Sequence, residues 1–334
     1  MGGKGYFLTA FSMLFLSTLK QMAVLLLFMG IGFTVKKCKA VGAEAARTLS
    51  QLENTVFIPA LILSTFIQQF TVATLSSAWK LLLFSLGIEA LAVPLAILCA
   101  RLAAKDGFIR KIYTYGLCFS NFAFMGNAVV QAIFPDTFIY YLIFTLPLWT
   151  LIYLWGVPAL LMEKEPSAEG EEQYKKQGFA SYLKKLINPM FIAMLIGAGI
   201  GLSGWKPPVF ITDTIATCGN CMSPLAMIIT GITFAGMNFK KVLSNAGIYL
   251  ISAIRLLIFP FLFGGAAWLI NRYWLAIPQT FYICLVCSMA MPLGLNTIVV
   301  PAAYGKDTSF AAGMALISHL LSILTIPLLL TVLL

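Results

Sequence analysis

Two apolar stretches of the sequence are interrupted by residues that could bind a ligand inside a membrane. The first contains Asn121, Gly126 and Asn127, and the second contains Pro292 and Asn296. Glycine weakens a helix and proline cannot complete its backbone hydrogen bonds, so both stretches are predicted to break in mid-membrane. Unwound backbone at that depth is tolerated only where it is buried in protein or lines a cavity. These matched interruptions are therefore the candidate binding site.

The chemistry of such a site suits an anion. A half-helix that starts at a break presents unbonded backbone N–H groups and the positive end of its dipole. The side chains of Asn121, Asn127 and Asn296 add hydrogen-bond donors and acceptors. A carboxylate is the simplest ligand of this kind. The alternative is that these asparagines only join neighbouring helices, as they commonly do in membranes.

Two charged residues, Glu89 and Arg255, stand at the centre of apolar stretches. Each costs about 2.5–3.5 kcal/mol at the middle of a membrane helix, so each is expected to face protein or water. An ion pair between them and a functional role are equally open: proton coupling for Glu89 and anion attraction for Arg255. Glu53 and Asn54 stand just before Pro59, and a bend of the helix at this proline and simple packing explain them equally well. His319 is interpreted as a histidine that contacts a neighbouring helix.

These residues lie in a chain that is too apolar for a soluble domain. Hydrophobic residues make up 60% of it and charged residues 10%, with a mean hydropathy of +0.93, whereas a soluble domain has roughly 25% charged residues. Ten segments are close to the roughly 20 residues that cross a hydrocarbon core. They run near 16–36, 48–66, 78–100, 112–134, 138–162, 187–204, 213–237, 243–270, 276–302 and 309–334.

The pattern of the first five segments recurs in the last five. Gly30-Ile31-Gly32 returns as Gly199-Ile200-Gly201, and Thr145-Leu146-Pro147 returns as Thr325-Ile326-Pro327. Because five is an odd number, the second set must enter the membrane with the opposite orientation. Inverted repeats are typical of secondary transporters, whose binding sites lie where the halves meet. We therefore predict an all-α polytopic membrane protein with ten transmembrane helices in two inverted five-helix repeats, residues 1–162 and 187–334, joined by a charged linker at 163–186.

The net charge of +10 follows from topology rather than from a nucleic-acid partner. If the N-terminus lies outside, most of the 22 Lys and Arg residues fall on the inner side, in the loops near 36–47, 101–111 and 164–185. This distribution fits the positive-inside rule. It predicts a multi-pass protein of the cell membrane, plasma or inner, with both termini extracytoplasmic and the linker in the cytoplasm.

No motif for catalysis or for a cofactor is present. The sequence contains no Walker motif, no dinucleotide fingerprint and no HExxH. Two CxxC spacings, at Cys218 and Cys284, lie in apolar segments without accompanying histidines and are interpreted as structural. We predict no enzyme activity, no metal and no cofactor.

Short motifs spread over nearly the whole chain carry a family resemblance. They are Pro59-Ala60-Leu61, Asn121 with Met125-Gly126, Asn188-Pro189, Arg255-Leu256 with Pro260, Met291-Pro292, Asn296, Tyr304-Gly305-Lys306-Asp307, Ser318 and Thr325-Ile326-Pro327. With these residues the chain resembles the auxin efflux carrier family in a prokaryotic form. The family often has Gly-x-Pro in its fourth helix. Here Gly126-Asn127-Ala128 stands in that place, which predicts a less sharp break.

The resemblance implies an architecture similar to sodium/proton antiporters and bile acid symporters. Broken helices four and nine would cross, helices 1, 2, 6 and 7 would form a scaffold, and helices 3–5 and 8–10 would move as an elevator. The implied substrates are organic anions, such as auxin in plants and malonate- or malate-like acids in bacteria.

We therefore expect a secondary carrier of a small organic anion, with the lipid bilayer as its surroundings. The predicted substrate-binding residues are Asn121, Gly126, Asn127, Pro292, Asn296 and Arg255. Glu89 is the predicted residue for proton coupling, and sodium is the other coupling ion considered. Gly197, Gly199 and Gly201 permit close helix approach, within the chain or in a homodimer. The alternatives are a cation-coupled symporter or sodium/proton antiporter of the same fold, and a non-transporting membrane sensor.

Overall fold

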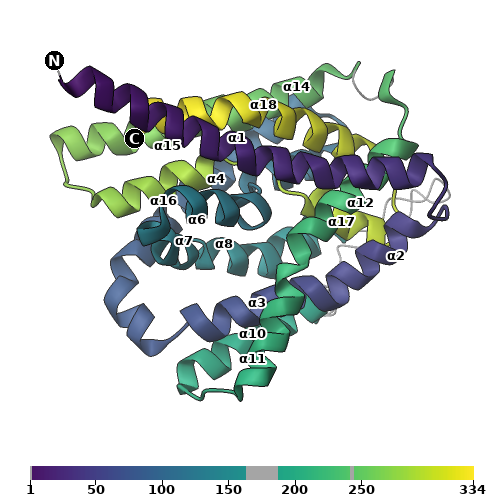
Figure 1. Cartoon of the computed structure of the whole chain (residues 1–334), viewed down its shortest axis with the longest axis horizontal. Coiled ribbons are helices and arrows are strands. Elements are labelled where there is room, and N and C mark those ends of the chain that lie inside the picture. The colour runs from purple at the N-terminus through teal and green to yellow at the C-terminus, as the bar shows by residue number, and fades with distance from the viewer. Residues whose placement is uncertain (1, 163–186, 241–243) are drawn as a thin grey trace.

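A computed structural model of the chain describes residues 2–162, 187–240 and 244–334, and the described residues are helical with no strand (Figure 1). The predicted linker at 163–186 lies outside the described residues. Helical segments before the linker are α1 (Gly2–Lys37), α2 (Ala45–Leu52), η1 (Glu53–Phe57), α3 (Ile58–Gln69), α4 (Val72–Ala103), α5 (Gly107–Cys118), η2 (Phe122–Gly126), α6 (Asn127–Ile133), η3 (Pro135–Thr137), α7 (Phe138–Phe144), α8 (Leu146–Leu151) and η4 (Ile152–Leu161).

After the linker, the chain again forms several short helices that are separated by interruptions. They are α10 (Pro189–Ser203), α11 (Val209–Asn220), α12 (Met222–Gly236), α14 (Ala246–Ala253), η5 (Ile254–Ile258), α15 (Phe259–Tyr273), α16 (Gln279–Ala290), α17 (Asn296–Ala303) and α18 (Ser309–Leu333). Each of the ten apolar segments overlaps one or more of these helices. The all-α fold class is confirmed, while the ten membrane crossings and the inverted orientation of the halves stay predictions.

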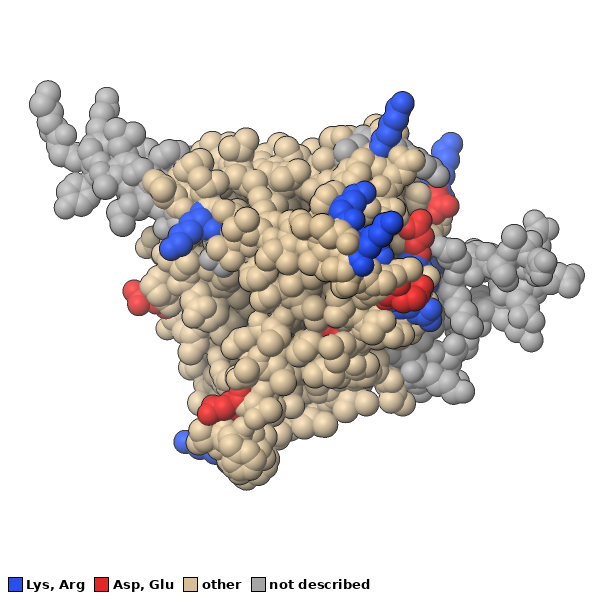
Figure 2. Space-filling view, turned by 45° about the vertical axis from the view of Figure 1, so that its right-hand side comes forward, with Lys and Arg blue, Asp and Glu red and all other residues tan. Residues whose placement is uncertain are grey.

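Five helical stretches in the described part of the chain are long and apolar enough to cross a membrane. They are Val72–Ala103, Pro135–Leu161, Val209–Gly236, Ala246–Tyr273 and Ser309–Leu333. Their apolar faces are only partly used for packing: in α4, 28% of the most apolar window is buried. Figure 2 shows a wide uncharged band, with most of the visible Lys and Arg side chains toward one end of the molecule. An uncharged surface of this extent requires lipid around it.

The helices pack in two zones that the eye can follow in Figure 1. Along one side, α1 packs lengthwise against α12 and also touches α18, which packs on α14. At the other end, α3 packs against α10 and α11. Between these zones, α2 packs against α12 and α17. The short helices α5, α16 and α17 lie in the interior, and they carry the two predicted interruptions.

Four π-helical segments widen the helices at η1, η2, η4 and η5. Three of them are explained by proline, which lacks the N–H that an α-helical turn needs. Pro59 follows η1, Pro158 lies inside η4, and Pro260 follows η5. No proline accompanies η2. Such insertions occur frequently at functional sites.

Candidate functional site

The first break follows α5 and comprises residues 119–121. Phe119 (φ −116°, ψ 105°) leaves the helical conformation, and Asn121 (φ −77°, ψ 44°) precedes η2. The Asn121 amide donates to the Pro292 carbonyl at 2.7 Å, outside its own helix. Its carbonyl accepts from the amides of both Met125 and Gly126, which starts the wider turn of η2. The fourth predicted segment therefore breaks without the family's proline.

The second break follows α16 and comprises residues 291–295, so it is longer than the first. Met291 is extended (φ −69°, ψ 145°), and Pro292 cannot donate a helical hydrogen bond. The Gly294 amide donates to the Phe119 carbonyl at 3.2 Å. A Cβ atom on Gly294 would stand 2.8 Å from that carbonyl oxygen, so only glycine allows this approach.

The two breaks lie against each other. Ser120 and Leu293 form an antiparallel bridge, and the Ser120 hydroxyl donates to the Ser288 carbonyl at 2.9 Å. Pairing the two extended segments satisfies backbone groups that neither helix could satisfy alone, as buried non-helical backbone requires. Both predicted interruptions are thus present, and the fold brings them together.

Arg255 binds the carboxyl ends of the helices that run into the breaks. Its guanidinium donates to the Leu117 carbonyl at 2.9 Å, the Ser288 carbonyl at 3.0 Å and the Met291 carbonyl at 3.2 Å. The side chain is 1% exposed. These carbonyls lie at the negative ends of α5 and α16, where a cation is favourable. Arg255 does not line the pocket described next, so its predicted attraction of an anion stays a prediction.

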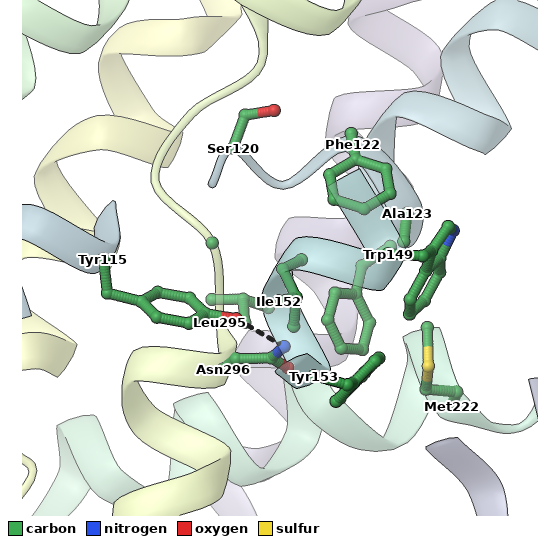
Figure 3. A pocket seen from close by; sticks show the side chains of 12 residues that line it. Tyr115, Ser120, Phe122, Ala123, Trp149, Ile152, Tyr153, Met222, Leu295 and Asn296 are labelled. Atoms are coloured by element: carbon green, nitrogen blue, oxygen red, sulfur yellow. Dashed lines mark hydrogen bonds between the residues drawn. The ribbon is translucent and has the colours of Figure 1, made fainter. Parts of the chain in front are cut away.

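A pocket lies beside the two breaks, where the next helices begin (Figure 3). Its volume is about 20 Å³, which holds about one water molecule. The lining residues are Tyr115, Ser120, Phe122, Ala123, Phe124, Trp149, Ile152, Tyr153, Met222, Gly294, Leu295 and Asn296. Phe122 and Asn296 each start a helix, and the start of a helix carries a partial positive charge. At α17 the amides of Thr297 and Ile298 already donate to the carbonyls of Gly294 and Leu295. Two positive helix ends therefore contribute to its wall.

Asn296 is the predicted site residue that lies in the pocket wall with a free polar atom. Its amide nitrogen donates to the Tyr115 hydroxyl at 2.9 Å, the contact drawn in Figure 3. Its side-chain oxygen has no hydrogen-bond partner in the described structure, although the residue is only 7% exposed. A buried amide oxygen without a partner is costly, so it marks a place for a donor from a ligand or water.

Asn121 uses its side chain for a helix contact. Its amide nitrogen lies 2.8 Å from Nε2 of His319, whose Nδ1 lies 2.8 Å from the Ala315 carbonyl. Since a carbonyl only accepts, Nδ1 carries the proton and Nε2 accepts from Asn121. His319 is therefore satisfied by two partners, as its interpretation as a contact residue requires. Asn121 itself is absent from the pocket wall, while its neighbours Ser120 and Phe122 line it.

Gly126 and Asn127 lie one turn beyond the pocket. A Cβ atom on Gly126 would stand 2.3 Å from the Tyr141 hydroxyl oxygen, so the glycine makes room for that tyrosine. The Tyr141 hydroxyl donates to the Phe122 carbonyl at 3.3 Å. Asn127 begins α6, and its side-chain oxygen has no partner in the described structure. Neither residue lines the pocket, so their predicted roles in binding stay predictions.

Glu89 is buried on α4, away from the pocket wall. Its charge lies close enough to Arg255 for the two to attract each other, but they form no ion pair in the described structure. One carboxylate oxygen of Glu89 has no hydrogen-bond partner there. The possibility of a direct ion pair, left open by the sequence, is therefore excluded in this conformation, and proton coupling at Glu89 stays a prediction.

Several wall residues carried no signal in the sequence. Tyr115, Trp149 and Tyr153 are aromatic residues in apolar helices, where lipid contact or core packing is the ordinary expectation. Tyr115 lies on α5, Trp149 on α8 and Tyr153 on η4, and the local sequence does not reveal that these helices meet beside the breaks. Among the described residues, no group of three His, Cys, Asp or Glu side chains could hold a metal ion.

Comparison with known proteins places the whole chain in context. The membrane transport protein family matches residues 17–330. An uncharacterized transporter of Methanothermobacter thermautotrophicus is 26% identical over 318 residues, which span 95% of this chain and 98% of that relative. Because the similarity runs through nearly all of both chains, it concerns the complete architecture and includes both breaks.

Proposed function

The chain belongs to the membrane transport protein family of auxin efflux carriers, and from this membership we propose that it is a secondary transporter of a small organic anion. The resemblance drawn from the sequence motifs is thereby confirmed. The substrate class, the mechanism and the coupling belong to the proposal.

The observation that carries the anion is the charge distribution of the paired breaks. Helices that begin at Phe122 and Asn296 turn their positive ends toward one pocket. The negative ends of α5 and α16 are bound by Arg255 instead. The amide of Asn296 and the hydroxyl of Tyr115 add neutral donors at the same wall. A carboxylate is held by such a site without a buried counter-charge.

The pocket must enlarge for this function. A volume of about 20 Å³ excludes even a small carboxylate, so the pocket is too narrow for the substrate in this conformation. In alternating access, the helices around the site separate on one side of the membrane and then on the other. We assign the conformation with this narrow pocket to a state between the one open to one side of the membrane and the one open to the other.

The packing supports a division of the helices into a scaffold and a moving part. The scaffold comprises α1, α2 with α3, α10, and α11 with α12, in which α1 packs on α12 and α3 packs on α10 and α11. The remaining helices carry the breaks and move past the scaffold as an elevator. The proposal includes ten membrane crossings in two inverted five-helix repeats, in the cell membrane, with both termini extracytoplasmic. A homodimer would form through the scaffold.

The test is thermal stabilisation of the purified protein by mono- and dicarboxylates. A ligand that binds the folded state raises the unfolding midpoint as its concentration increases. We expect at least one carboxylate to do so, and Asn296→Ala to lose that response. Asn220→Ala is the matched control, because Asn220 is exposed and does not line the pocket. A carboxylate that stabilises the wild-type protein and not Asn296→Ala should also exchange in a counterflow assay with proteoliposomes.

Two outcomes would contradict the proposal. If no carboxylate raises the unfolding midpoint and none exchanges in counterflow, an organic anion is not the substrate. An equal response in Asn296→Ala and Asn220→Ala would move the binding site away from the second break. The cation-coupled symporter or antiporter is the second candidate, and buried carboxyl groups without partners favour it.

A further inference from the structure

One face of α2 and η1 carries a row of buried oxygen atoms without partners. Glu53 and Asn54 stand three and four residues after Ser50, so each lies on the same helical face as Ser50. Their neighbours Gln51 and Thr55 are exposed. Within the described structure, the Ser50 hydroxyl, both Glu53 carboxylate oxygens and the Asn54 amide oxygen accept or donate no hydrogen bond. All four are oxygens, and one group carries the negative charge.

Glu53 is the most demanding of these groups. Its exposed fraction is 0%, and a bare carboxylate in such surroundings is strongly disfavoured. Native structures supply partners for nearly all buried polar groups, so an orphan carboxylate requires an explanation. It forms no ion pair in the described part of the chain.

No neighbouring side chain neutralises this charge. Among the helices that pack against η1, the described residues of α3, α10, α12 and α17 include no charged side chain. Arg47 on α2 and Asp213 on α11 are exposed, and Cys218 on α11 is partly buried. Tyr153 of η4 lies close enough to feel the Glu53 charge, but it supplies no positive charge. The missing partner must therefore be a bound cation.

The row of oxygens also connects to the substrate pocket. The Asn54 amide nitrogen donates to the Val299 carbonyl of α17 at 3.1 Å, one turn after Asn296. Tyr153 lines the pocket as well as lying near Glu53. A cation held by Glu53 and the Asn54 oxygen is therefore linked through the Asn54 side chain to α17, the helix that carries the pocket asparagine.

We propose that Ser50, Glu53 and Asn54 form a binding site for a monovalent cation, sodium or a proton, that couples to the anion pocket through α17. The coupling rests on the proposed function, while the cation site itself stands on the geometry of α2 and η1. Sodium would take up to four of these oxygens as ligands. A proton would sit on the Glu53 carboxyl and be shared with the Ser50 or Asn54 oxygen.

The experiment measures the unfolding midpoint of the full chain in the absence of any carboxylate. Sodium is titrated against choline at fixed pH, and pH is then varied without sodium. Wild type, Glu53→Gln and Ser50→Ala are compared with Glu44→Gln, which removes an exposed carboxylate from the residue before α2. Ser50→Ala keeps the carboxyl and removes one oxygen, so it tests the site if Glu53→Gln fails to fold.

A sodium site predicts a midpoint that rises with the logarithm of sodium concentration in wild type and in Glu44→Gln. Glu53→Gln should abolish the rise, and Ser50→Ala should shift it to several-fold higher sodium. A proton site predicts no sodium response. The midpoint should instead fall as pH is raised in wild type and change less in Glu53→Gln, because burial disfavours the charged carboxyl.

The proposal is overturned if wild type responds to neither cation, or if Glu53→Gln keeps both responses. It is also overturned if Glu89→Gln, and not Glu53→Gln, removes the response, since the carboxyl on α4 would then be the one that binds. A cation response without any carboxylate binding would remove the proposed anion transport and leave the Glu53 site. Carboxylate binding that does not depend on the cation would overturn the coupling through α17 and leave the proposed anion transport.

Discussion

The first break, at residues 119–121, and the second, at residues 291–295, solve the same problem by different means. The second contains Pro292 and Gly294, so its own sequence interrupts the helix. The first has neither residue, and its Asn121 amide bonds the Pro292 carbonyl of the second. The second break is therefore favoured by its own residues, whereas the first depends on its partner, and the hydrogen bonds between them hold both open.

The breaks also differ in what their asparagines do. Asn121 is tied to His319 and helps to fix α18 beside the crossing. Asn296 lines the pocket, where its amide nitrogen is the donor available to a carboxylate and its unbonded oxygen requires a donor such as a water or a ligand hydroxyl. The first break thus supports the crossing, and the second supplies the polar group for a ligand. The predictions below separate these two roles.

Removal of Arg255 should have the largest effect, because that residue serves both breaks at once. Arg255→Met leaves the carbonyls of Leu117, Ser288 and Met291 without their donor. Hydrogen bonds to charged groups contribute about 1.5–3 kcal/mol each, so the loss should exceed about 3 kcal/mol of folding free energy. The unfolding midpoint and the detergent-solubilised yield measure it.

Arg255→Lys tests the same contact more gently. A lysine ammonium is a point charge that cannot reach the three carbonyls with a planar fork, so most of the stability should still be lost. A variant that keeps the wild-type midpoint and loses carboxylate binding would contradict this role. It would return Arg255 to the anion-attracting role predicted from the sequence.

Gly294→Ala should be the next most harmful change, and it should act on the second break. The new Cβ would stand 2.8 Å from the Phe119 carbonyl oxygen, a backbone atom that cannot move alone. Overpacking of this kind costs typically about 1–3 kcal/mol, and here it would also separate the two breaks. Counterflow should be lost together with a drop in midpoint.

The matched glycine control is Gly87→Ala in α4, where a Cβ atom meets nothing within 4 Å. Its midpoint and counterflow should stay at wild-type level. If Gly294→Ala keeps the wild-type midpoint and counterflow as Gly87→Ala does, the breaks do not depend on close backbone contact. The interpretation that the second break holds the first one open would then be wrong.

Local features of the sequence were sufficient for the positions of the breaks and for the apolar segments. Pro292 and Gly294 mark the second break, and Asn121 ends the first, but Gly126 and Asn127 lie in helix beyond the first break. The partners of Arg255 were not visible, because the Leu117 carbonyl is 138 residues away along the chain. Tyr115 and Tyr153 of the pocket wall look like core residues in their own helices. Pairing between distant segments decides both features.

Asn296→Ala should weaken carboxylate binding more than Asn121→Ala does. Loss of one neutral hydrogen bond to the ligand corresponds to about 1 kcal/mol, roughly a five- to tenfold weaker affinity. Asn121→Ala should instead lower the midpoint, because His319 Nε2 loses its donor in a buried site. Titration of the stabilising carboxylate into both variants, with the midpoint in its absence, separates the two effects. Equal loss of affinity in both would place both asparagines on the ligand.

Pro292→Ala should have the smallest effect. It is also the most direct test of the interpretation that hydrogen bonds between the two breaks hold both of them open. The first break forms without proline, so the pairing of Asn121 with residue 292 and of Gly294 with Phe119 should keep the second break open as well. The expected cost is about 1 kcal/mol, mainly from the freer unfolded chain. Counterflow should persist at a reduced midpoint. If Pro292→Ala instead abolishes counterflow as Gly294→Ala does, helix nine has straightened. The proline would then impose the crossing on both helices, and the mutual hydrogen bonds would only follow it.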